Sequence, residues 1–187
     1  MQTTEAFSVR EATCQDIPAI VDIHNGNVRT PTLLSHQGFL LATTTAEEVL
    51  DQFKKCVQYW VAVDCTERIR GFVAFSYFKL DENSLTAIFW YDESEREAIM
   101  GDRHIYIHVV ATQKGYTVLG IARLMYKNLE RHFPNSVFST FIVCQPICNQ
   151  RSIQFHQQQG FKVVGKVERE QFLDLKNYES VLLIKRT

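Results

Sequence analysis

The sequence predicts a mixed α/β (or α+β) fold with a sheet of about seven strands and about four helices. Strand-like apolar runs alternate along the chain with amphipathic segments that carry helix-capping residues. The 187 residues are enough for a sizeable core but not for a second full domain, so we expect a single domain over residues 1–187. Hydrophobic residues at 45% and charged residues at 22% are typical of a globular protein.

The charge and the termini narrow the range of partners. A formal net charge of -1, with no basic run, predicts neither a nucleic-acid nor a membrane partner. The N-terminus lacks a signal-peptide pattern, and no apolar run approaches the roughly 20 residues of a membrane span, so we expect a cytoplasmic protein. Five cysteines without zinc-ligand spacing predict no metal site and free, mostly buried thiols.

The first half of the chain predicts two helices and three strands. Residues 7–12 form the first expected strand, and Asp16 can cap a following helix with an apolar face. Residues 25–45 read as a long loop, because glycine and proline interrupt them. Two overlapping Thr-x-x-Glu capping boxes open a helix over residues 44–55. Two apolar runs within residues 59–80 predict a hairpin.

The second half continues the alternation. Residues 81–103 are a mixed insertion with an aromatic run and an acidic run, and residues 103–112 read as a strand. An amphipathic stripe predicts a helix over residues 120–132, which Pro134 ends. The chain closes with a strand, a short helix and two strands, at residues 136–144, 149–161, 161–167 and 178–186.

The start of the helix at Gly120 predicts an anion site. A strand that leads into a helix beginning Gly-Ile-Ala exposes unpaired amides at the positive end of the helix dipole. The pattern is neither a nucleotide P-loop nor the G-x-G-x-x-G dinucleotide fingerprint. Taken alone, this stretch is equally compatible with a glycine that only begins a helix.

A second stretch, "PICNQRSIQFHQQQGF" at residues 146–161, resembles the C-terminal signature of the GNAT superfamily of acetyl-CoA-dependent N-acetyltransferases. With it, "VVATQKGYTVLGIARLM" resembles the pyrophosphate loop of that family, with about two extra residues. The resemblance covers nearly the whole chain. It implies a mostly antiparallel sheet with splayed fourth and fifth strands, acetyl-CoA as co-substrate, an amine acceptor (a small molecule or a protein amine) and direct attack in a ternary complex.

The resemblance also implies which residues hold the cofactor. The pyrophosphate would contact the amides of Val118, Leu119, Gly120, Ile121 and Ala122, and the pantetheine arm would contact Val110, Ala111 and Thr112. Asn149 and Ser152 would face the cofactor. Asn149 could equally be a plain helix cap, and Lys114 could either meet the phosphates or be a solvated loop residue.

For catalysis, strand alternation places His104, Tyr106 and His108 on one face and the apolar residues between them on the other. By resemblance His108 is the first candidate for general base and Tyr106 the second, unless this face is structural. His156 stands where the family often has a tyrosine that protonates the leaving thiolate. It could keep that role or only pack.

The acceptor pocket is expected from residues 25–45, the helix that follows and the insertion 81–103, with aromatic side chains as lining or as core. Three alternatives stay open: a catalytically silent acyl-CoA-binding sensor on the same fold, an unrelated binding module, and an enzyme that uses a longer acyl-CoA. The sequence leaves the acceptor open, and a homodimer is possible.

Overall fold

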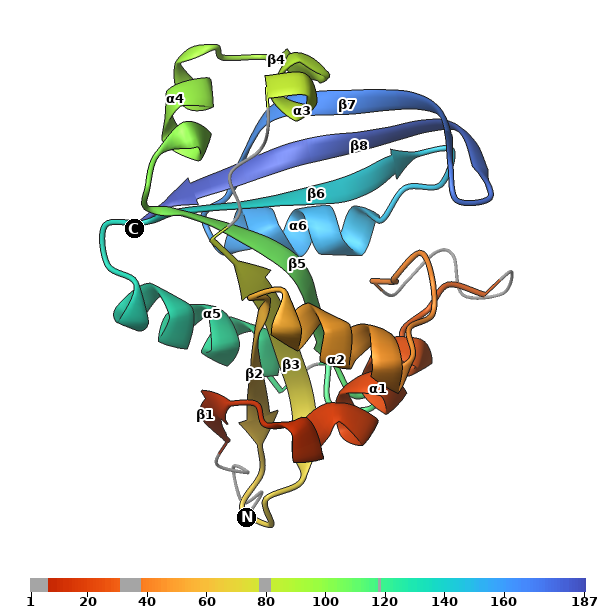
Figure 1. Cartoon of the computed structure of the whole chain (residues 1–187), viewed down its shortest axis with the longest axis vertical. Coiled ribbons are helices and arrows are strands. Elements are labelled where there is room, and N and C mark those ends of the chain that lie inside the picture. The colour runs from red at the N-terminus through yellow and green to blue at the C-terminus, as the bar shows by residue number, and fades with distance from the viewer. Residues whose placement is uncertain (1–6, 31–37, 78–81, 118) are drawn as a thin grey trace. The chain divides into compact units, whose positions relative to one another are not determined.

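The computed structural model describes residues 7–30, 38–77, 82–117 and 119–187, which divide into two units (Figure 1). Unit 1 comprises Met1–Val28, Leu40–Ser76 and Ile107–Pro134. Unit 2 comprises Arg29–Phe39, Tyr77–Tyr106 and Asn135–Thr187. The strand β5 (His104–Thr112) contributes its first three residues to unit 2 and the rest to unit 1.

Unit 1 is built on β1 (Ser8–Glu11), β2 (Gln58–Val63) and β3 (Ile69–Ser76), followed in strand order by the second half of β5. β1 pairs antiparallel with β2, and β2 pairs antiparallel with β3 across the predicted hairpin. β3 is buried from its third residue to its last. This continuous burial follows because helices cover both faces of the strands in this unit.

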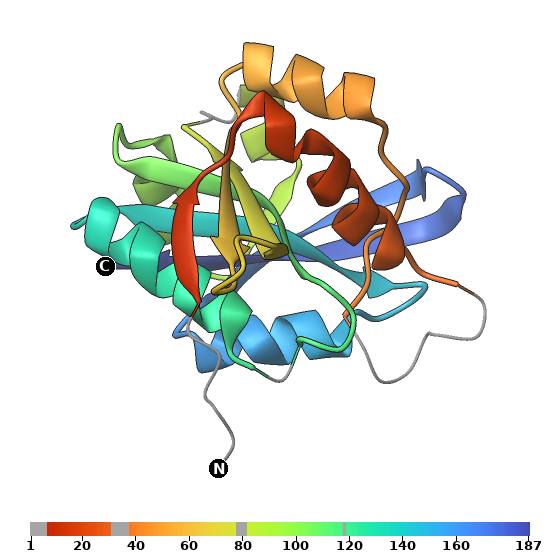
Figure 2. The same cartoon turned by 90° about the horizontal axis from the view of Figure 1, so that it is seen from below.

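The helices of unit 1 form two layers around its strands (Figure 2). α1 (Ile17–Gly26) and α2 (Ala46–Lys54) lie on one face, where apolar side chains from both helices share a core with β2 and β3. α5 (Ile121–His132) lies on the other face, against β3, β2 and β1. The capping box that starts α2 is the second of the two predicted ones, with Thr45 and Glu48 bonded reciprocally.

Gly71 sets how closely α5 approaches β3. A Cβ at this position would lie 3.0 Å from the carbonyl oxygen of Ala111, 3.0 Å from Cγ2 of Ile121 and 3.3 Å from Cε of Met125. Only a residue without a side chain leaves room for these contacts. The glycine therefore brings the first turns of α5 directly onto β3, beside the end of β5.

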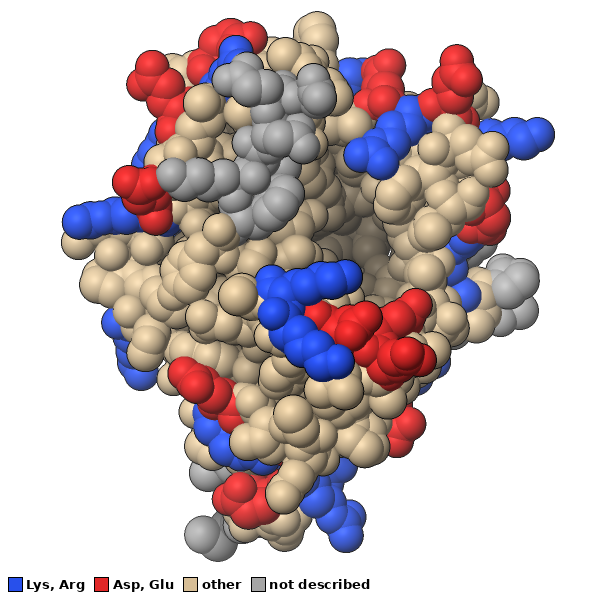
Figure 3. Space-filling view, viewed as in Figure 1, with Lys and Arg blue, Asp and Glu red and all other residues tan. Residues whose placement is uncertain are grey.

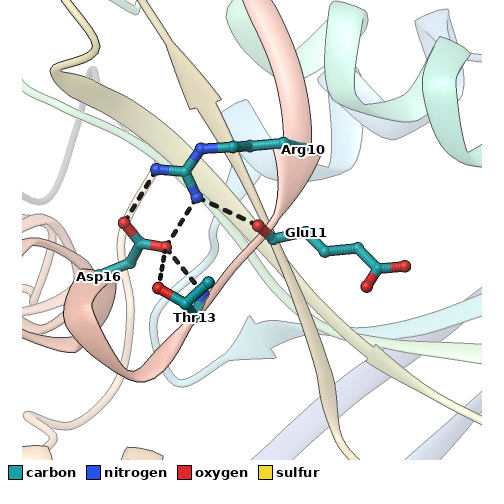
Figure 4. A network of polar contacts seen from close by, with 4 residues as sticks. All are labelled: Arg10, Glu11, Thr13 and Asp16. Carbon is teal, nitrogen blue, oxygen red and sulfur yellow. Dashed lines mark hydrogen bonds and ion pairs between the residues drawn. The ribbon is translucent and has the colours of Figure 1, made fainter.

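Asp16 precedes α1 as predicted, but its carboxylate does not cap that helix (Figure 4). It accepts two bonds from the Arg10 guanidinium, at 2.8 and 3.0 Å, and one from the amide of Thr13 at 2.7 Å. It thereby closes the 3₁₀ turn Cys14–Asp16 and ties β1 to the start of α1. The Arg10 bond is the largest cause that lowers the pKa of Asp16 to about 2.

Unit 2 contains the strand order β5-β6-β8-β7-β4, with β6 at Val137–Gln145, β8 at Leu175–Arg186, β7 at Lys162–Phe172 and β4 at Ile88–Trp90. β5 pairs parallel with β6 at three positions, from His104↔Val137 to Tyr106↔Ser139, while the other pairs are antiparallel. This short parallel register agrees with the expected splaying of these two strands.

The helices of unit 2 are α3 (Glu82–Thr86), α4 (Ser94–Met100) and α6 (Gln150–Gln158). Its apolar core joins α3 and α4 to the sheet through Leu85, Ile99, Val164 and Leu182. The predicted fold class is confirmed. The described chain has eight strands and six α-helices rather than about seven and four, because residues 81–103 form α3, β4 and α4 instead of an irregular insertion.

The surface agrees with the near-neutral charge. On the face shown in Figure 3, Lys and Arg side chains lie among Asp and Glu side chains. Within the described ranges, every helix is too short or too polar to cross a membrane.

Candidate active site

The start of α5 presents open backbone amides. Gly120 is the N-cap residue, has φ +77 and provides no side-chain cap. The first helical bond runs from the Leu124 amide to the Gly120 carbonyl at 2.9 Å, so the amides of residues 121–123 lie ahead of the helical ladder. A Cβ on Gly120 or on Gly115 would meet nothing within 4 Å among the described residues. Among the described residues, the helix start is therefore open and lies ahead of the helical hydrogen bonds, as an anion site requires.

The residues of unit 1 that were predicted to bind the cofactor lie at the end of β5 and around the start of α5. Ala111 and Thr112 are buried, and Val110 is half-buried. Ile121 is buried and can offer only its amide, whereas Leu119 is exposed and Ala122 is half-buried. Val118 lies outside the described residues.

Asn27 is a residue of this region that the sequence did not single out. Its Nδ2 donates to the Thr112 carbonyl at 2.9 Å and to the Ile23 carbonyl at 2.7 Å. The end of α1 therefore fixes the end of β5. The sequence gives little indication of this role, because the Thr112 carbonyl that Asn27 contacts lies 85 positions further along the chain.

His108 forms a pair with Ser76, which the sequence also did not indicate. Nε2 of His108 and Oγ of Ser76 lie 2.8 Å apart. Ser76 is buried at the end of β3, while the His108 residue remains exposed to solvent. Partial desolvation by the surrounding protein lowers the pKa of His108. The imidazole is therefore neutral at pH 7 and able to accept a proton.

The three polar side chains predicted on one face of β5 have different environments. His104 is buried, and its Nε2 lies 2.6 Å from Oγ of Ser139, which gives it a structural role in unit 2. Tyr106 is half-buried beside Phe141, and burial raises its pKa to about 12. A phenol with this pKa is a weaker candidate for a base than His108.

Asn149 has its side chain engaged within unit 2. Its Oδ1 accepts from the Ser152 amide at 3.4 Å and so caps α6, as one of the two sequence alternatives proposed. Its Nδ2 donates to the Phe39 carbonyl at 2.8 Å. The residue therefore joins the start of α6 to a segment 110 positions earlier in the chain.

His156 is buried in α6 and is a poor proton donor. Its Nδ1 lies 2.7 Å from the Ser152 carbonyl, a bond that requires the proton on Nδ1. Burial lowers its pKa to about 4. The neutral ring that results at pH 7 favours the packing alternative over proton donation to a thiolate.

The cysteines correct one expectation. Four of the five are exposed and Cys144 is half-buried, whereas the sequence led us to expect mostly buried thiols. Burial and the hydrogen bond to Glu179 raise the pKa of Cys144 to about 12. A thiol with this pKa is not a nucleophile at neutral pH.

The aromatic residues considered for an acceptor pocket separate into two groups. Phe39 and Phe75 are buried, while Tyr77, Phe89 and Tyr91 are more than half exposed. Phe89 and Tyr91 contact each other edge to face, with ring centroids 5.9 Å apart. Within the candidate residues, unit 1 thus holds His108, the end of β5 and the start of α5, and unit 2 holds Tyr106 and α6.

Comparison with known proteins identifies the family of this chain. Residues 33–161, more than half of the chain, match the model of the Acetyltransferase (GNAT) family. The chain belongs to the GNAT family of acetyltransferases. The family resemblance inferred from the two sequence stretches is therefore confirmed, and acetyl transfer is the general activity of this family.

Solved structures support the fold of this GNAT protein over nearly its full length. An N-acetyltransferase from Staphylococcus aureus Mu50 has a TM-score of 0.65 at 15% identity, covering 97% of this chain and 98% of that one. Arabidopsis thaliana NAA60 with a bisubstrate analogue has a TM-score of 0.65 at 14% identity, covering 97% and 98%. The yncA protein of Salmonella typhimurium, whose structure contains its cofactor acetyl-CoA, has a TM-score of 0.64 at 14% identity, covering 97% and 94%. Among curated protein sequences, no relative matches the chain.

Proposed function

We propose that this GNAT protein transfers an acetyl group from acetyl-CoA to an amine, by direct attack in a ternary complex. The observation that carries the proposal is the uncapped start of α5 directly after β5. There the amides of residues 120–122 would bind the pyrophosphate, and the backbone of residues 110–112 would bind the pantetheine arm. Acetyl-CoA would supply the activated acetyl thioester.

His108 is the proposed general base. Nε2 of His108 lies 2.8 Å from Oγ of Ser76, which orients the ring, and a neutral imidazole can take a proton from the attacking amine directly or through water. The lowered pKa keeps the ring neutral at pH values where an ordinary histidine is already charged. Ser76 is thus a positioning residue that fixes the orientation of the His108 ring.

We further propose that residues 1–187 act as one cytoplasmic acyltransferase domain without a metal cofactor. The family match supports the single domain, because residues 33–161 include segments of both units. The acceptor is a small-molecule or protein amine, and a homodimer is compatible with this proposal.

The proposal is tested first by a thermal melt with and without acetyl-CoA. A ligand that binds only the folded state stabilises it by about 2.7 kcal/mol at 100 times its dissociation constant. A panel of amines is then tested by mass spectrometry of the acetylated product. This readout is preferable to a thiol reagent, because Cys14, Cys56, Cys65 and Cys148 are exposed and would react.

Three outcomes are distinguishable. Stabilisation with product formation supports the proposal. Stabilisation without any product would favour the silent acyl-CoA-binding alternative, and no stabilisation at millimolar acetyl-CoA would refute the cofactor site.

The role of His108 as general base is tested by substitution. His108→Gln should lower kcat about 10²- to 10⁴-fold, with the Kd for acetyl-CoA unchanged. Tyr106→Phe should have a much smaller effect.

A further inference from the structure

Arg70 is a half-buried arginine at the start of β3 with partners on two sides. Its side chain is 13% exposed. Nε donates to Oδ2 of Asp64 at 2.7 Å, and Nη1 donates to Oε1 of Gln113 at 2.7 Å. Asp64 belongs to the β2–β3 turn, whereas Gln113 is the first residue after β5. All three residues belong to unit 1.

The connection from β5 to α5 meets Arg70 in three ways. Besides the bond to the Gln113 side chain, the Gln113 amide donates to the Arg70 carbonyl at 2.8 Å. The Arg70 guanidinium also lies over the ring of Tyr116, with Cζ 4.4 Å from the ring centroid. The Tyr116 amide closes the turn between them by donating to the Gln113 carbonyl at 3.0 Å. Arg70 therefore determines the path of residues 113–116.

Asp64, the partner of Arg70 in the β2–β3 turn, is itself held in place by hydrogen bonds within that turn. Oδ1 of Asp64 accepts from the amide and the hydroxyl of Thr66, at 2.8 and 2.7 Å, and from the amide of Arg68 at 3.1 Å. The Thr66 hydroxyl and Arg70 hold the pKa of Asp64 well below its usual range, so the carboxylate stays charged. The guanidinium is thereby held between a fixed carboxylate and the loop.

We propose that Arg70 is a positioning residue for acetyl-CoA binding, because it preorders the loop that leads to the open amides at Gly120. This inference rests on the proposed function. A loop that is already fixed loses less conformational entropy when it binds a ligand, and so binds more tightly. Lysine cannot replace this arginine, because it lacks the planar fork that contacts Asp64, Gln113 and the Tyr116 ring together.

The test compares Arg70→Met with Arg10→Met by calorimetric titration of acetyl-CoA. Arg10 is a matched control in the same unit, since it also pairs with a buried aspartate, and its hydrogen bonds in the described part of the chain go to Asp16 and the Glu11 carbonyl. Arg70→Met should weaken the Kd for acetyl-CoA about 10-fold through lost preorganisation, with kcat at saturation nearly unchanged. Arg70→Lys should not restore the affinity. Arg10→Met should leave the Kd unchanged.

Gln113→Ala and Tyr116→Leu provide a second test that leaves the Arg70–Asp64 pair intact. Each single variant should bind acetyl-CoA more weakly than the wild type. When either is combined with Arg70→Met, the affinity should fall little further than in Arg70→Met alone. This pair also tests the inference if Arg70→Met does not fold. Fully additive effects would overturn it, because Arg70 would then act by another route, such as a direct contact with a phosphate.

Failure of this inference is distinct from failure of the proposed function. If the wild-type protein binds acetyl-CoA and the Arg70, Gln113 and Tyr116 variants bind equally well, only the positioning role is overturned. If the wild-type protein does not bind, the cofactor site itself is refuted.

Discussion

Gly120→Glu, compared with Gly120→Gln, tests the anion site at the start of α5. The two side chains have the same size and differ in charge. Nothing lies within 4 Å of a Cβ at this position among the described residues, so the Cβ of either variant has room there. Both share the cost of a non-glycine residue at φ +77, about 1 kcal/mol. The carboxylate recovers about 0.3–1 kcal/mol of that cost from the helix dipole.

The difference in affinity follows from Coulomb's law. A carboxylate about 5 Å from a phosphate charge costs roughly 0.8 kcal/mol at a dielectric constant of about 80 and roughly 3 kcal/mol at about 20. Two phosphate charges therefore cost at least about 1.6 kcal/mol, which corresponds to a Kd about 15-fold weaker for the Glu variant than for the Gln variant. The gap should narrow at high salt, because ions screen exposed charges.

The assay is calorimetric titration of acetyl-CoA into both variants at low and high salt, with a thermal melt of each to confirm folding. If both the Glu and the Gln variant bind acetyl-CoA as tightly as the wild type, a pyrophosphate at this helix start is refuted. A Gln variant that loses binding as completely as the Glu variant would show that loop conformation, not charge, decides affinity.

Three further outcomes concern stability. Gly71→Ala should lower the free energy of unfolding, measured by urea titration, by about 1–3 kcal/mol through overpacking. The control Gly26→Ala has no atom within 4 Å of the added Cβ among the described residues, and should be neutral or slightly stabilising in the same measurement. Asp16 has a lowered folded pKa of about 2, so its contribution is full above its unfolded pKa of about 3.9 and is lost as the pH falls to about 2. Asp16→Asn should thus be destabilising at pH 7 but not at pH 2. His156 also has a depressed pKa, of about 4, so its contribution to the free energy of unfolding is full above pH about 6.5 and declines towards pH 4. In His156→Asn the stability should fall less over this pH range, as measured by chemical denaturation at a series of pH values.

Local signals in the sequence predicted the frame of the site. Gly120 marked a helix start because a glycine ahead of an amphipathic stripe suits a left-handed N-cap position, and Thr45 marked α2 through its capping box. Each of these signals depends on residues within one or two turns. The same holds for the β2–β3 hairpin, whose apolar runs and polar turn are adjacent in the chain.

Pairs of distant residues could not be predicted in the same way. His108 was singled out from strand alternation, but its partner Ser76 lies 32 positions earlier and becomes adjacent only because β3 and β5 are neighbours in the sheet. Alternation assigns a side chain to a face without indicating what covers that face. For this reason His104 and His108 looked alike in the sequence, although one is buried against Ser139 and the other is exposed.

The protonation states of these groups constrain the acceptor chemistry. His156 is neutral and buried, and the Cys144 thiol has a pKa of about 12, so neither suits proton transfer at pH 7, which supports the proposal of His108 as the base. The leaving thiolate needs little acid help, because a thiol with pKa about 8.5 is a fair leaving group. The acceptor needs more help, since a lysine-like amine with pKa about 10.4 is almost wholly protonated at neutral pH, while an α-amine with pKa about 7.7–8.0 is partly neutral. His108→Gln should therefore reduce transfer to an alkyl amine more than transfer to an α-amine, and equal losses for both in product analysis by mass spectrometry would argue that His108 is not the base.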